Sequence, residues 1–261
     1  MIDFHNHILP NVDDGSISLD MSINMLSEAS KQGITEVVNT VHYQHPKFDE
    51  KDIDIDRING LKNELEYELE NKGISIKLHL GAEVFYYPNL LKIMDNPLAT
   101  IGKGKYMLIE FHPRLIPKSH KQHLFNLKMA GVTPIIAHPE RYKDVQENIS
   151  IVNRWLEAGC IIQIDAGSPL GLLGKKSKIA SLEIIKNNWF QILGSDAHDN
   201  KNRRFCLKRA LDYIRNFVED PEMYVVKNPK KIINGEPISI DIQYKKTDKY
   251  NFFKHLFKNK T

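Results

Sequence analysis

The chain opens with the stretch Ile2-Asp3-Phe4-His5-Asn6-His7, in which a short apolar run leads into two histidines. Its first residues have the composition of a buried strand, and the histidines stand where a strand gives way to a loop. Six more runs of this kind follow, most of them separated from the next by a longer stretch with helical periodicity. This alternation is typical of βα units around a parallel sheet and predicts an α/β fold.

These patterns predict strands and helices along most of the chain. The predicted strands are Ile2–Phe4, Glu36–Val41, Ile76–Leu80, Tyr106–Ile109, Thr133–Ala137, Cys160–Ile164 and Trp189–Leu193. The predicted helices cover residues 19–32, 52–71, 118–130, 145–158, 176–187 and 201–217. Several of these helices end at a glycine, as is common just past a helix C-terminus: Gly33, Gly73, Gly131 and Gly159.

Each predicted strand is followed by a side chain that can bind a metal ion. In chain order these side chains are His5 with His7, His42, Glu83, Glu110, His138, Asp165, and Asp196 with His198. In a βα barrel the C-terminal ends of the strands meet at one face, so residues far apart in sequence become neighbours there. Histidines scattered over the surface would not recur at the end of each predicted strand. The pattern therefore predicts a metal site at the mouth of a barrel, although Asp165 could instead accept hydrogen bonds from the backbone.

The chemistry of these side chains indicates which metals they suit. Imidazoles and carboxylates without a thiolate are suited to Mn²⁺, Fe²⁺, Zn²⁺ or Co²⁺. About eight such groups exceed what one ion can use, so more than one metal is expected. Ions held close together can clamp a phosphate, lower the pKa of a bridging water, and stabilise both the attacking and the leaving oxygen.

The two cysteines, Cys160 and Cys206, form neither a disulfide framework nor a Cys-x-x-Cys pair. Neither is followed by the Cys-x5-Arg phosphate loop of the cysteine-dependent tyrosine phosphatases. Phosphate chemistry in this chain would therefore need another nucleophile, and a metal-bound hydroxide is the obvious candidate.

Length and charge narrow the remaining classes. The 261 residues, 41% of them hydrophobic, suffice for one large α/β domain or two small ones. The apolar stretches are far shorter than the ~20 residues that span a bilayer, and no signal peptide is apparent, so a cytoplasmic protein is expected. Residues 245–261 contain six Lys and one Asp, which leaves 30 basic and 32 acidic side chains in residues 1–244. This near-neutral body disfavours nucleic-acid binding.

Short motifs surround the predicted ligands. They are His5-x-His7, Asp13-Asp14-Gly15, Val41-His42, Gly81-Ala82-Glu83, Ile109-Glu110-Phe111, Ala137-His138-Pro139-Glu140-Arg141 and Ser195-Asp196-Ala197-His198. In this order they resemble the PHP (polymerase and histidinol phosphatase) family, and most of all its bacterial tyrosine phosphatases of capsular and exopolysaccharide gene clusters. The resemblance runs from residue 1 to about residue 240. It implies a distorted (βα)7 barrel, similar to a TIM barrel, with three metals.

The resemblance also implies how the ligands divide among the ions. His5, His7, Glu83 and Asp196 would hold the first ion, Glu83 would bridge to a second held by Glu110 and His138, and Asp14, His42 and His198 would hold the third. Manganese is the expected metal, with iron, zinc, cobalt and magnesium as alternatives. Either Asp13 or Asp14 could turn inward from the tight Asp-Asp-Gly turn, so that choice stays open.

Two arginines, Arg141 and Arg203, match positions that resemble the phosphate binders of this family. A guanidinium suits the role because its fork donates two charge-assisted hydrogen bonds to phosphoryl oxygens. His42, or a metal-linked water, is a candidate acid for the leaving group. The need for such an acid is small, since the phenol of tyrosine has a pKa of about 10.

The resemblance implies a metal-dependent phosphatase that hydrolyses phosphotyrosine on proteins and regulates a membrane-associated tyrosine kinase of capsule or exopolysaccharide synthesis. A phosphatase of histidinol phosphate or another small phosphomonoester is the alternative within the family, and a polymerase-associated exonuclease a more distant one. The amidohydrolases also carry His-x-His on a barrel strand, but this chain has Glu83 and Glu110 where their bridging Lys and further His are expected. A degenerate barrel used only for binding would lack ligands, and none is missing.

Other conspicuous residues have alternative interpretations. The run Phe85-Tyr86-Tyr87-Pro88 follows a predicted ligand and could stack against a phenyl ring, although an aromatic run in a loop more often packs locally. The remaining histidines are expected to pack or to face solvent, namely His45, His79, His112, His120, His123 and His255.

The predicted barrel domain covers residues 1–244, and a basic, aromatic tail covers residues 245–261. Asn228-Pro229 and Asn234-Gly235-Glu236-Pro237 predict turns in a segment that wraps the barrel. In the tail, Phe252/Leu256 and Phe253/Phe257 are i,i+4 pairs with lysines around them. Such a segment could contact an anionic membrane surface or simply pack on the barrel.

Overall fold

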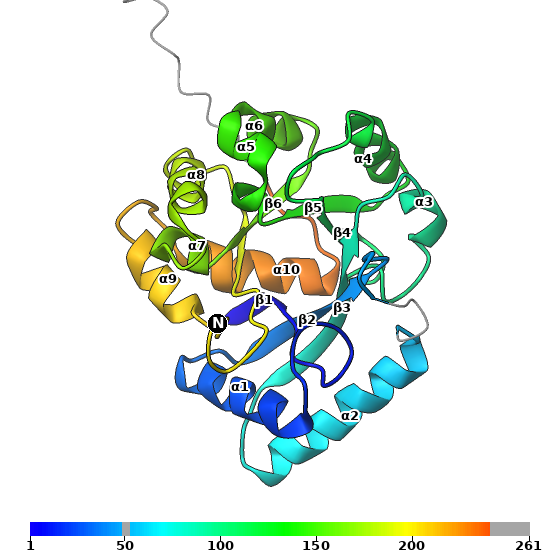
Figure 1. The fold of residues 1–261 in the computed structure, drawn as a ribbon, viewed down its shortest axis with the longest axis vertical. Coiled ribbons are helices and arrows are strands. Elements are labelled where there is room, and N and C mark those ends of the chain that lie inside the picture. Colours follow the sequence, from blue (N-terminus) through cyan, green and yellow to red (C-terminus); the bar gives the residue numbers. More distant parts are fainter. Residues whose placement is uncertain (49–52, 241–261) are drawn as a thin grey trace, which may run out of the picture.

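Seven parallel strands form the centre of the fold (Figure 1). The structure is a computed structural model and describes residues 1–48 and 53–240. The strands pair in chain order: β1 (Ile2–Asn6), β2 (Glu36–Tyr43), β3 (Lys77–Phe85), β4 (Tyr106–Glu110), β5 (Thr133–Ala137), β6 (Ile161–Asp165) and β7 (Ile192–Gly194). Backbone bonds from His7 N–H to Ala197 O and from Asp196 N–H to His5 O join β1 to the segment after β7. The sheet is therefore a nearly closed barrel, and the predicted seven-stranded α/β barrel is confirmed.

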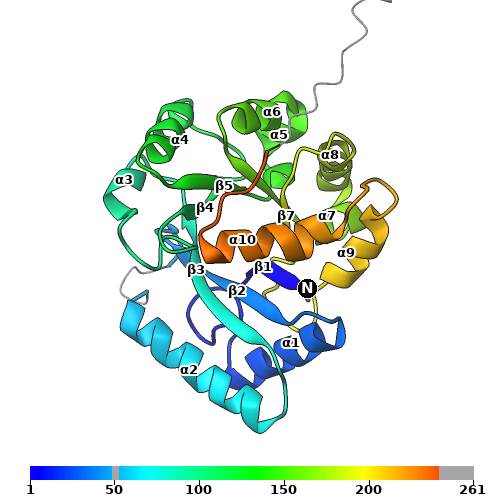
Figure 2. The same ribbon diagram turned by 180° about the vertical axis from the view of Figure 1, so that it is seen from behind.

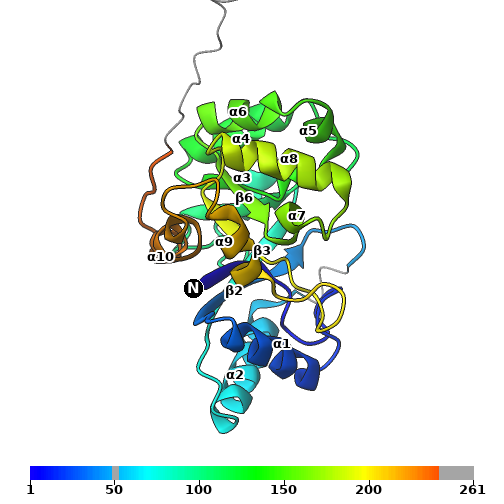
Figure 3. The same cartoon turned by 90° about the vertical axis from the view of Figure 1, so that its left-hand side faces the viewer.

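Helices surround the barrel (Figures 1 and 3). They are α1 (Leu19–Lys31), α2 (Ile55–Asn71), α3 (Leu90–Ile93), α4 (His120–Met129), α5 (Lys143–Glu147), α6 (Ser150–Glu157), α7 (Gly167–Leu170), α8 (Lys175–Lys186), α9 (Leu207–Ile214) and α10 (Asn228–Asn234), with short turns of other helix types at η2 (Pro139–Arg141) and η3 (Met223–Lys227). Two helix predictions were wrong in extent. The helix expected at 145–158 is interrupted at Asn148, whose backbone is not helical, and Asp199 holds residues 201–203 in a turn by accepting their N–H groups, so α9 begins late.

Several strands extend past their predicted last residue, and β3 does so by the most. β3 extends to Phe85 because it pairs with β2 along the whole length of β2, up to Tyr43 against Val84. Glu83 consequently lies inside the strand and not after it. Glu83 is the register partner of His42 on β2, so the two residues lie side by side at the mouth of the barrel.

Two buried clusters fill the molecule. Inside the barrel lie alternate strand residues such as Phe4, Leu108 and Ile135, while their neighbours Ile109 and Ile136 face outward against the helices. Side chains of a strand point alternately to its two faces, which explains the division. The barrel interior is thus apolar through much of its depth. Glu36 and His79, 2.7 Å apart, lie near its amino end, and the predicted metal ligands lie at the carboxyl ends of the strands.

The helix α10 closes the end of the barrel that lies opposite the carboxyl ends of the strands, and in Figure 2 it crosses in front of the strands. Ile232 of α10 is fully buried and belongs to the interior cluster. The prediction of a turn at Asn228-Pro229 was wrong, because these are the first residues of α10. Proline is tolerated there since the first N–H groups of a helix have no helical acceptor. Gly235, with a φ of 76°, ends the helix.

The C-terminal part of the prediction falls outside the described residues. This applies to residues 241–244 of the predicted barrel domain and to the whole tail, residues 245–261. The boundary between domain and tail therefore stays a prediction. Within residues 1–48 and 53–240, no helix has the length and apolar character needed to cross a bilayer.

Candidate metal centre

The nine predicted ligands come together at the carboxyl ends of the strands. They lie on β1 or the loop after it (His5, His7, Asp14), on β2 (His42), on β3 (Glu83), at the end of β4 (Glu110), and directly after β5 (His138) and β7 (Asp196, His198). A cavity of about 340 Å³ opens at this face and is lined by seven of the nine, all except His5 and His7, together with Arg141 and Arg203. The side chains separate into small groups whose ligand atoms lie close together.

The first group joins His5, His7 and Asp196. The Nε2 atoms of the two imidazoles are 3.3 Å apart, and Oδ1 of Asp196 lies 3.4 Å from each of them. Other residues fix the far side of both rings: His5 Nδ1 is 3.1 Å from Oε1 of Gln163, and His7 Nδ1 is 2.8 Å from Oδ2 of Asp13. A metal-binding histidine typically engages its second nitrogen in this way, which leaves Nε2 for a cation.

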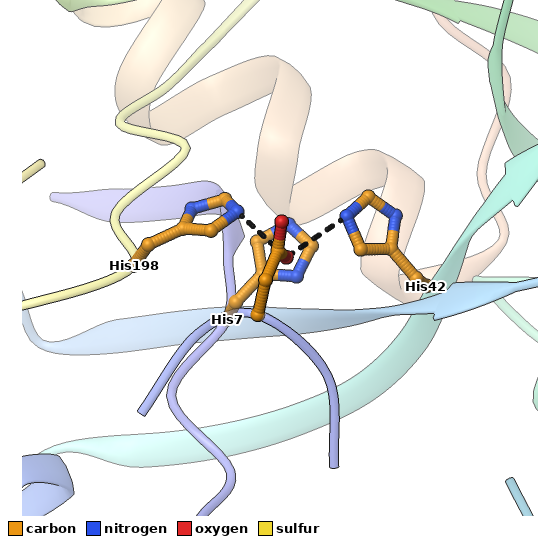
Figure 4. Close-up of side chains that lie close together, drawn as sticks. His7, His42 and His198 are labelled. Atoms are coloured by element: carbon orange, nitrogen blue, oxygen red, sulfur yellow. Dashed lines mark ion pairs between the residues drawn. The ribbon is translucent and has the colours of Figure 1, made fainter. Parts of the chain in front are cut away.

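The second group joins His7, His42, His198 and Asp14. Figure 4 shows His42 and His198 on either side of His7. Oδ1 of Asp14 lies 3.2 Å from His42 Nε2 and 3.3 Å from His198 Nε2. The turn Asp13-Asp14-Gly15, which carries Asp14, needs a glycine at its third position, because a Cβ atom on Gly15 would lie 2.2 Å from the backbone oxygen of His7.

The two aspartates of the turn have different surroundings. Asp13 is buried behind His7, where its Oδ2 also accepts the backbone N–H of His42 at 3.1 Å. Asp14 faces the imidazoles of His42 and His198. Of the two alternatives left open by the sequence, the geometry favours Asp14 as the ligand and Asp13 as the residue that orients His7.

Glu83 links the groups across the barrel. Its Oε1 lies 2.7 Å from His138 Nε2, and its Oε2 lies 3.3 Å from both His5 Nε2 and His42 Nδ1. The geometry groups Glu83 and His138 with His5, whereas Glu110 gathers with His42 and His45. His45 was expected only to pack or face solvent. Its spacing in His42-x-x-His45 was the sequence signal that could have indicated a place near the ligands.

The buried carboxylates fit a site for divalent cations. Oδ1 of Asp196 and Oε2 of Glu110 are buried without a hydrogen-bond donor among the described residues. Burial and the charge of nearby Glu83 raise the pKa of the Glu110 carboxyl well above its usual range. Buried acceptors without donors and carboxylates that repel one another are both stabilised by cations. With imidazoles and no thiolate around them, they suit the divalent metals expected from the sequence.

Two of the predicted ligands have a strained backbone. His138 has a φ of 30° and Asp196 a φ of 47°, values that are uncommon for residues other than glycine. The Oε1 atom of Gln163 accepts the N–H of His138 at 3.2 Å, and the backbone oxygen of His5 accepts that of Asp196 at 2.7 Å. Strain of this kind persists where surrounding contacts impose it, commonly at functional sites. Here it accompanies the turn of both side chains toward the cavity.

The two arginines share one carboxylate oxygen. Arg141 and Arg203 both donate to Oδ2 of Asp196. Burial lowers the pKa of Arg141, but the charges of Asp196 and Asp165 outweigh it and hold that pKa above its usual range. Asp165 accepts the backbone N–H of Gly167 at 2.7 Å, which is the alternative predicted for it. Both guanidiniums thus stand at the cavity wall beside the candidate ligands.

Sequence reasoning missed the buried residues that support the site. Asp3 accepts the hydroxyl of Ser195 at 2.5 Å and its backbone N–H at 3.1 Å, which ties β1 to the segment carrying Asp196 and His198. Gln163 contacts both His5 and the backbone of His138. The available signal was a polar residue inside an apolar strand, which must find partners when it is buried.

The sequence has relatives among known proteins. The family model described as capsular polysaccharide synthesis, CpsB/CapC, matches residues 1–234. The chain is 34% identical over 245 residues to a protein named putative tyrosine-protein phosphatase CapC of Staphylococcus aureus, covering 93% of this chain and 94% of that one.

Solved structures give the same result. A structure described as YwqE from Bacillus subtilis and CpsB from Streptococcus pneumoniae, unique metal-dependent tyrosine phosphatases, superposes with a TM-score of 0.85 at 30% identity, covering 92% of this chain and 97% of that one. The histidinol phosphate phosphatase of Lactococcus lactis shares the fold alone, with a TM-score of 0.58 at 14% identity over 85% of this chain and 94% of that one. The resemblance drawn from the sequence motifs is confirmed. The chain belongs to the CpsB/CapC family of capsular polysaccharide synthesis.

Proposed function

We propose that this chain is a metal-dependent phosphatase that hydrolyses phosphotyrosine on proteins. One observation carries the proposal: a single cavity combines a cluster of imidazoles and carboxylates with the guanidiniums of Arg141 and Arg203. Cations and guanidiniums together match the charge of a phosphate dianion. The relatives named as tyrosine phosphatases support the phosphotyrosine substrate.

The ligands proposed for the ions are the nine residues predicted from the sequence. His5, His7, Glu83 and Asp196 would hold one ion, Glu83, Glu110 and His138 a second, and Asp14, His42 and His198 a third, with manganese as the proposed metal. Glu110 is the member of this division that lies in another group, with His42 and His45. Bound divalent ions supply Lewis acidity for the phosphoryl oxygens and lower the pKa of a water that attacks phosphorus. Two or three ions are proposed because the ligand groups outnumber what one ion can use.

The roles proposed for the protein's own residues follow from their contacts. Arg141 and Arg203 donate to the equatorial oxygens of the phosphoryl group, and their pairing with Asp196 holds both forks in place before substrate binds. Asp13 fixes His7 through Nδ1 and His42 through its backbone N–H. His42 is the proposed acid for the departing phenolate, a role in which only modest assistance is needed.

The proposed substrate is a membrane-associated tyrosine kinase of capsule or exopolysaccharide synthesis. The name of the matching family supports the link to capsule synthesis. The proposed location is cytoplasmic, at the inner face of the membrane. The basic tail, residues 245–261, would provide a peripheral contact with anionic lipid, since each Lys near such a surface adds ~1 kcal/mol of attraction.

The test compares two substrates side by side. Steady-state rates of the manganese-loaded protein are measured on a phosphotyrosine peptide and on histidinol phosphate, which represents the alternative of a small phosphomonoester. We expect a much higher kcat/KM for the phosphotyrosine peptide. A preference for histidinol phosphate would replace the proposal by that alternative, and the absence of hydrolysis of either ester would reject a phosphatase altogether.

A further inference from the structure

A row of aromatic rings in contact with one another leads from the candidate ligands to the protein surface. The ring centroids of His42 and His45 are 4.6 Å apart, and those of His45 and Phe85 are 5.1 Å apart with the rings nearly perpendicular. The next contact joins Phe85 to Tyr87 at 5.6 Å, and Tyr87 is exposed. His42, His45 and Phe85 all line the 340 Å³ cavity. One wall of the cavity is therefore aromatic.

The aromatic run 85–87 faces two directions. Tyr86 is buried against Phe111, with 4.8 Å between ring centroids, and its hydroxyl bonds to Nδ1 of His123 at 2.5 Å. Phe85 is the last residue of β3, so its side chain points to the other face and reaches the cavity. Of the three aromatic residues, Phe85 is the one in contact with the space beside the ligands.

The polar and aromatic walls come from different arcs of the barrel. His45 belongs to the loop after β2 and Phe85 to β3, whereas Arg141 follows β5 and Arg203 follows β7. The candidate ligands lie between these arcs because they occupy the strand ends themselves. A molecule bound in the cavity would thus meet guanidiniums on one side and ring surfaces on the other, with the candidate ligands between them.

We propose that Phe85, with His45 beside it, forms the subsite for the phenyl ring of phosphotyrosine. This inference rests on the proposed function, because it places the ring of a substrate whose phosphate lies at the ligands. Aromatic pairs prefer edge-to-face or offset contacts, and the perpendicular pair of His45 and Phe85 offers both an edge and a face. The wall thereby selects aryl phosphates over alkyl phosphates, which have no ring to place against it.

Binding of two inert ligands tests the subsite without relying on turnover. Phenylphosphonate and methylphosphonate carry the same charged group and differ in the ring. Their dissociation constants for the manganese-loaded protein are measured by calorimetry. We expect wild type to prefer phenylphosphonate, and Phe85→Ala to weaken phenylphosphonate on the order of tenfold while methylphosphonate changes by less than about twofold.

Two further variants separate the ring from general damage. Phe85→Leu keeps an apolar side chain of similar size and should lose part of the preference for phenylphosphonate. Tyr86→Phe is the matched control, since it alters the neighbouring aromatic residue that faces away from the cavity, and it should leave both constants unchanged. If Phe85→Ala does not fold, the ratio of the two constants in Phe85→Leu decides.

Three results would overturn the subsite. They are equal affinity of wild type for the two phosphonates, unchanged phenylphosphonate binding after substitution of Phe85, or an equal loss for both ligands. Failure of the proposed function gives a different result. In that case wild type and Phe85→Ala would still differ in phenylphosphonate binding, but the phosphotyrosine peptide would not be hydrolysed.

Discussion

The Nε2 atoms of His5 and His7 lie 3.3 Å apart and face the same oxygen, Oδ1 of Asp196. Both rings are oriented by other residues through Nδ1, so neither can turn away without losing a buried contact. Two nitrogen lone pairs and a carboxylate oxygen directed at one point form a site that suits a divalent cation better than any neutral partner.

The first prediction concerns these two histidines. The double substitution His5→Ala/His7→Ala should lower the number of divalent ions bound per chain and abolish turnover, because it removes both imidazole nitrogens of the group that they form with Asp196. Metal content after dialysis is measured by elemental analysis, with circular dichroism as the check on folding. His123→Ala, which removes a histidine outside the groups, is the matched control. Full activity of metal-stripped wild type would contradict the prediction.

The second prediction concerns the arginines. Arg141→Ala should lower kcat/KM on a phosphotyrosine peptide by about a hundredfold, the scale of losing a charge-assisted contact in the transition state. Arg141→Lys should not restore the rate, because an ammonium cannot reproduce the planar fork. Arg203→Ala is expected to act in the same direction.

The adjacent Arg204 provides the control for Arg203, since it is exposed and does not line the cavity. Arg204→Ala should leave kcat/KM within about twofold of wild type, which is the behaviour of a surface substitution away from special contacts. Equal losses in Arg203→Ala and Arg204→Ala would indicate that net charge, and not a specific contact, is responsible.

The third prediction concerns stability at the junction of β1 and the segment after β7. Asp3→Ala should lower the free energy of unfolding by about 2–4 kcal/mol, because the backbone N–H and hydroxyl of Ser195 lose their buried acceptor. Asp3→Asn keeps one acceptor oxygen and should lose less. Urea unfolding followed by circular dichroism measures the difference, and equal stability of Asp3→Ala and wild type would refute it.

The strands and the place of the site could be predicted because short apolar runs and the chemistry at their ends are local features of the sequence. The choice between Asp13 and Asp14 could not be made, since one residue in a tight turn decides which carboxylate points inward. The grouping of Glu110 with His45 depends on side-chain reach across two strands. The helix α10 was missed because Asn228-Pro229 suits both a turn and a helix start.

The fourth prediction concerns the tail, whose residues lie outside those the structure describes. Deletion of residues 248–261 should reduce sedimentation of the protein with anionic liposomes and leave hydrolysis of a soluble phosphotyrosine peptide near wild type. The expectation follows from the lysines around the i,i+4 apolar pairs. Unchanged liposome binding, or a lower thermal midpoint in the truncated protein, would instead indicate that the tail packs on the barrel.

The last prediction is that Cys206 takes no part in catalysis. Cys206 is only 5% exposed. Burial raises the pKa of its thiol, and the charge of Asp165 raises it further. A thiol in such surroundings is a poor nucleophile, because the thiolate is the reactive form. Burial likewise raises the pKa of Cys160 to about 12. Cys206→Ser should therefore retain kcat/KM within a few fold, and acid quenching during turnover of a radiolabelled phosphotyrosine peptide should leave no label on the protein. A phosphocysteine would survive the quench long enough to be detected by mass spectrometry. Label on Cys206, or loss of activity in a folded Cys206→Ser protein, would require a covalent mechanism in place of direct attack by water.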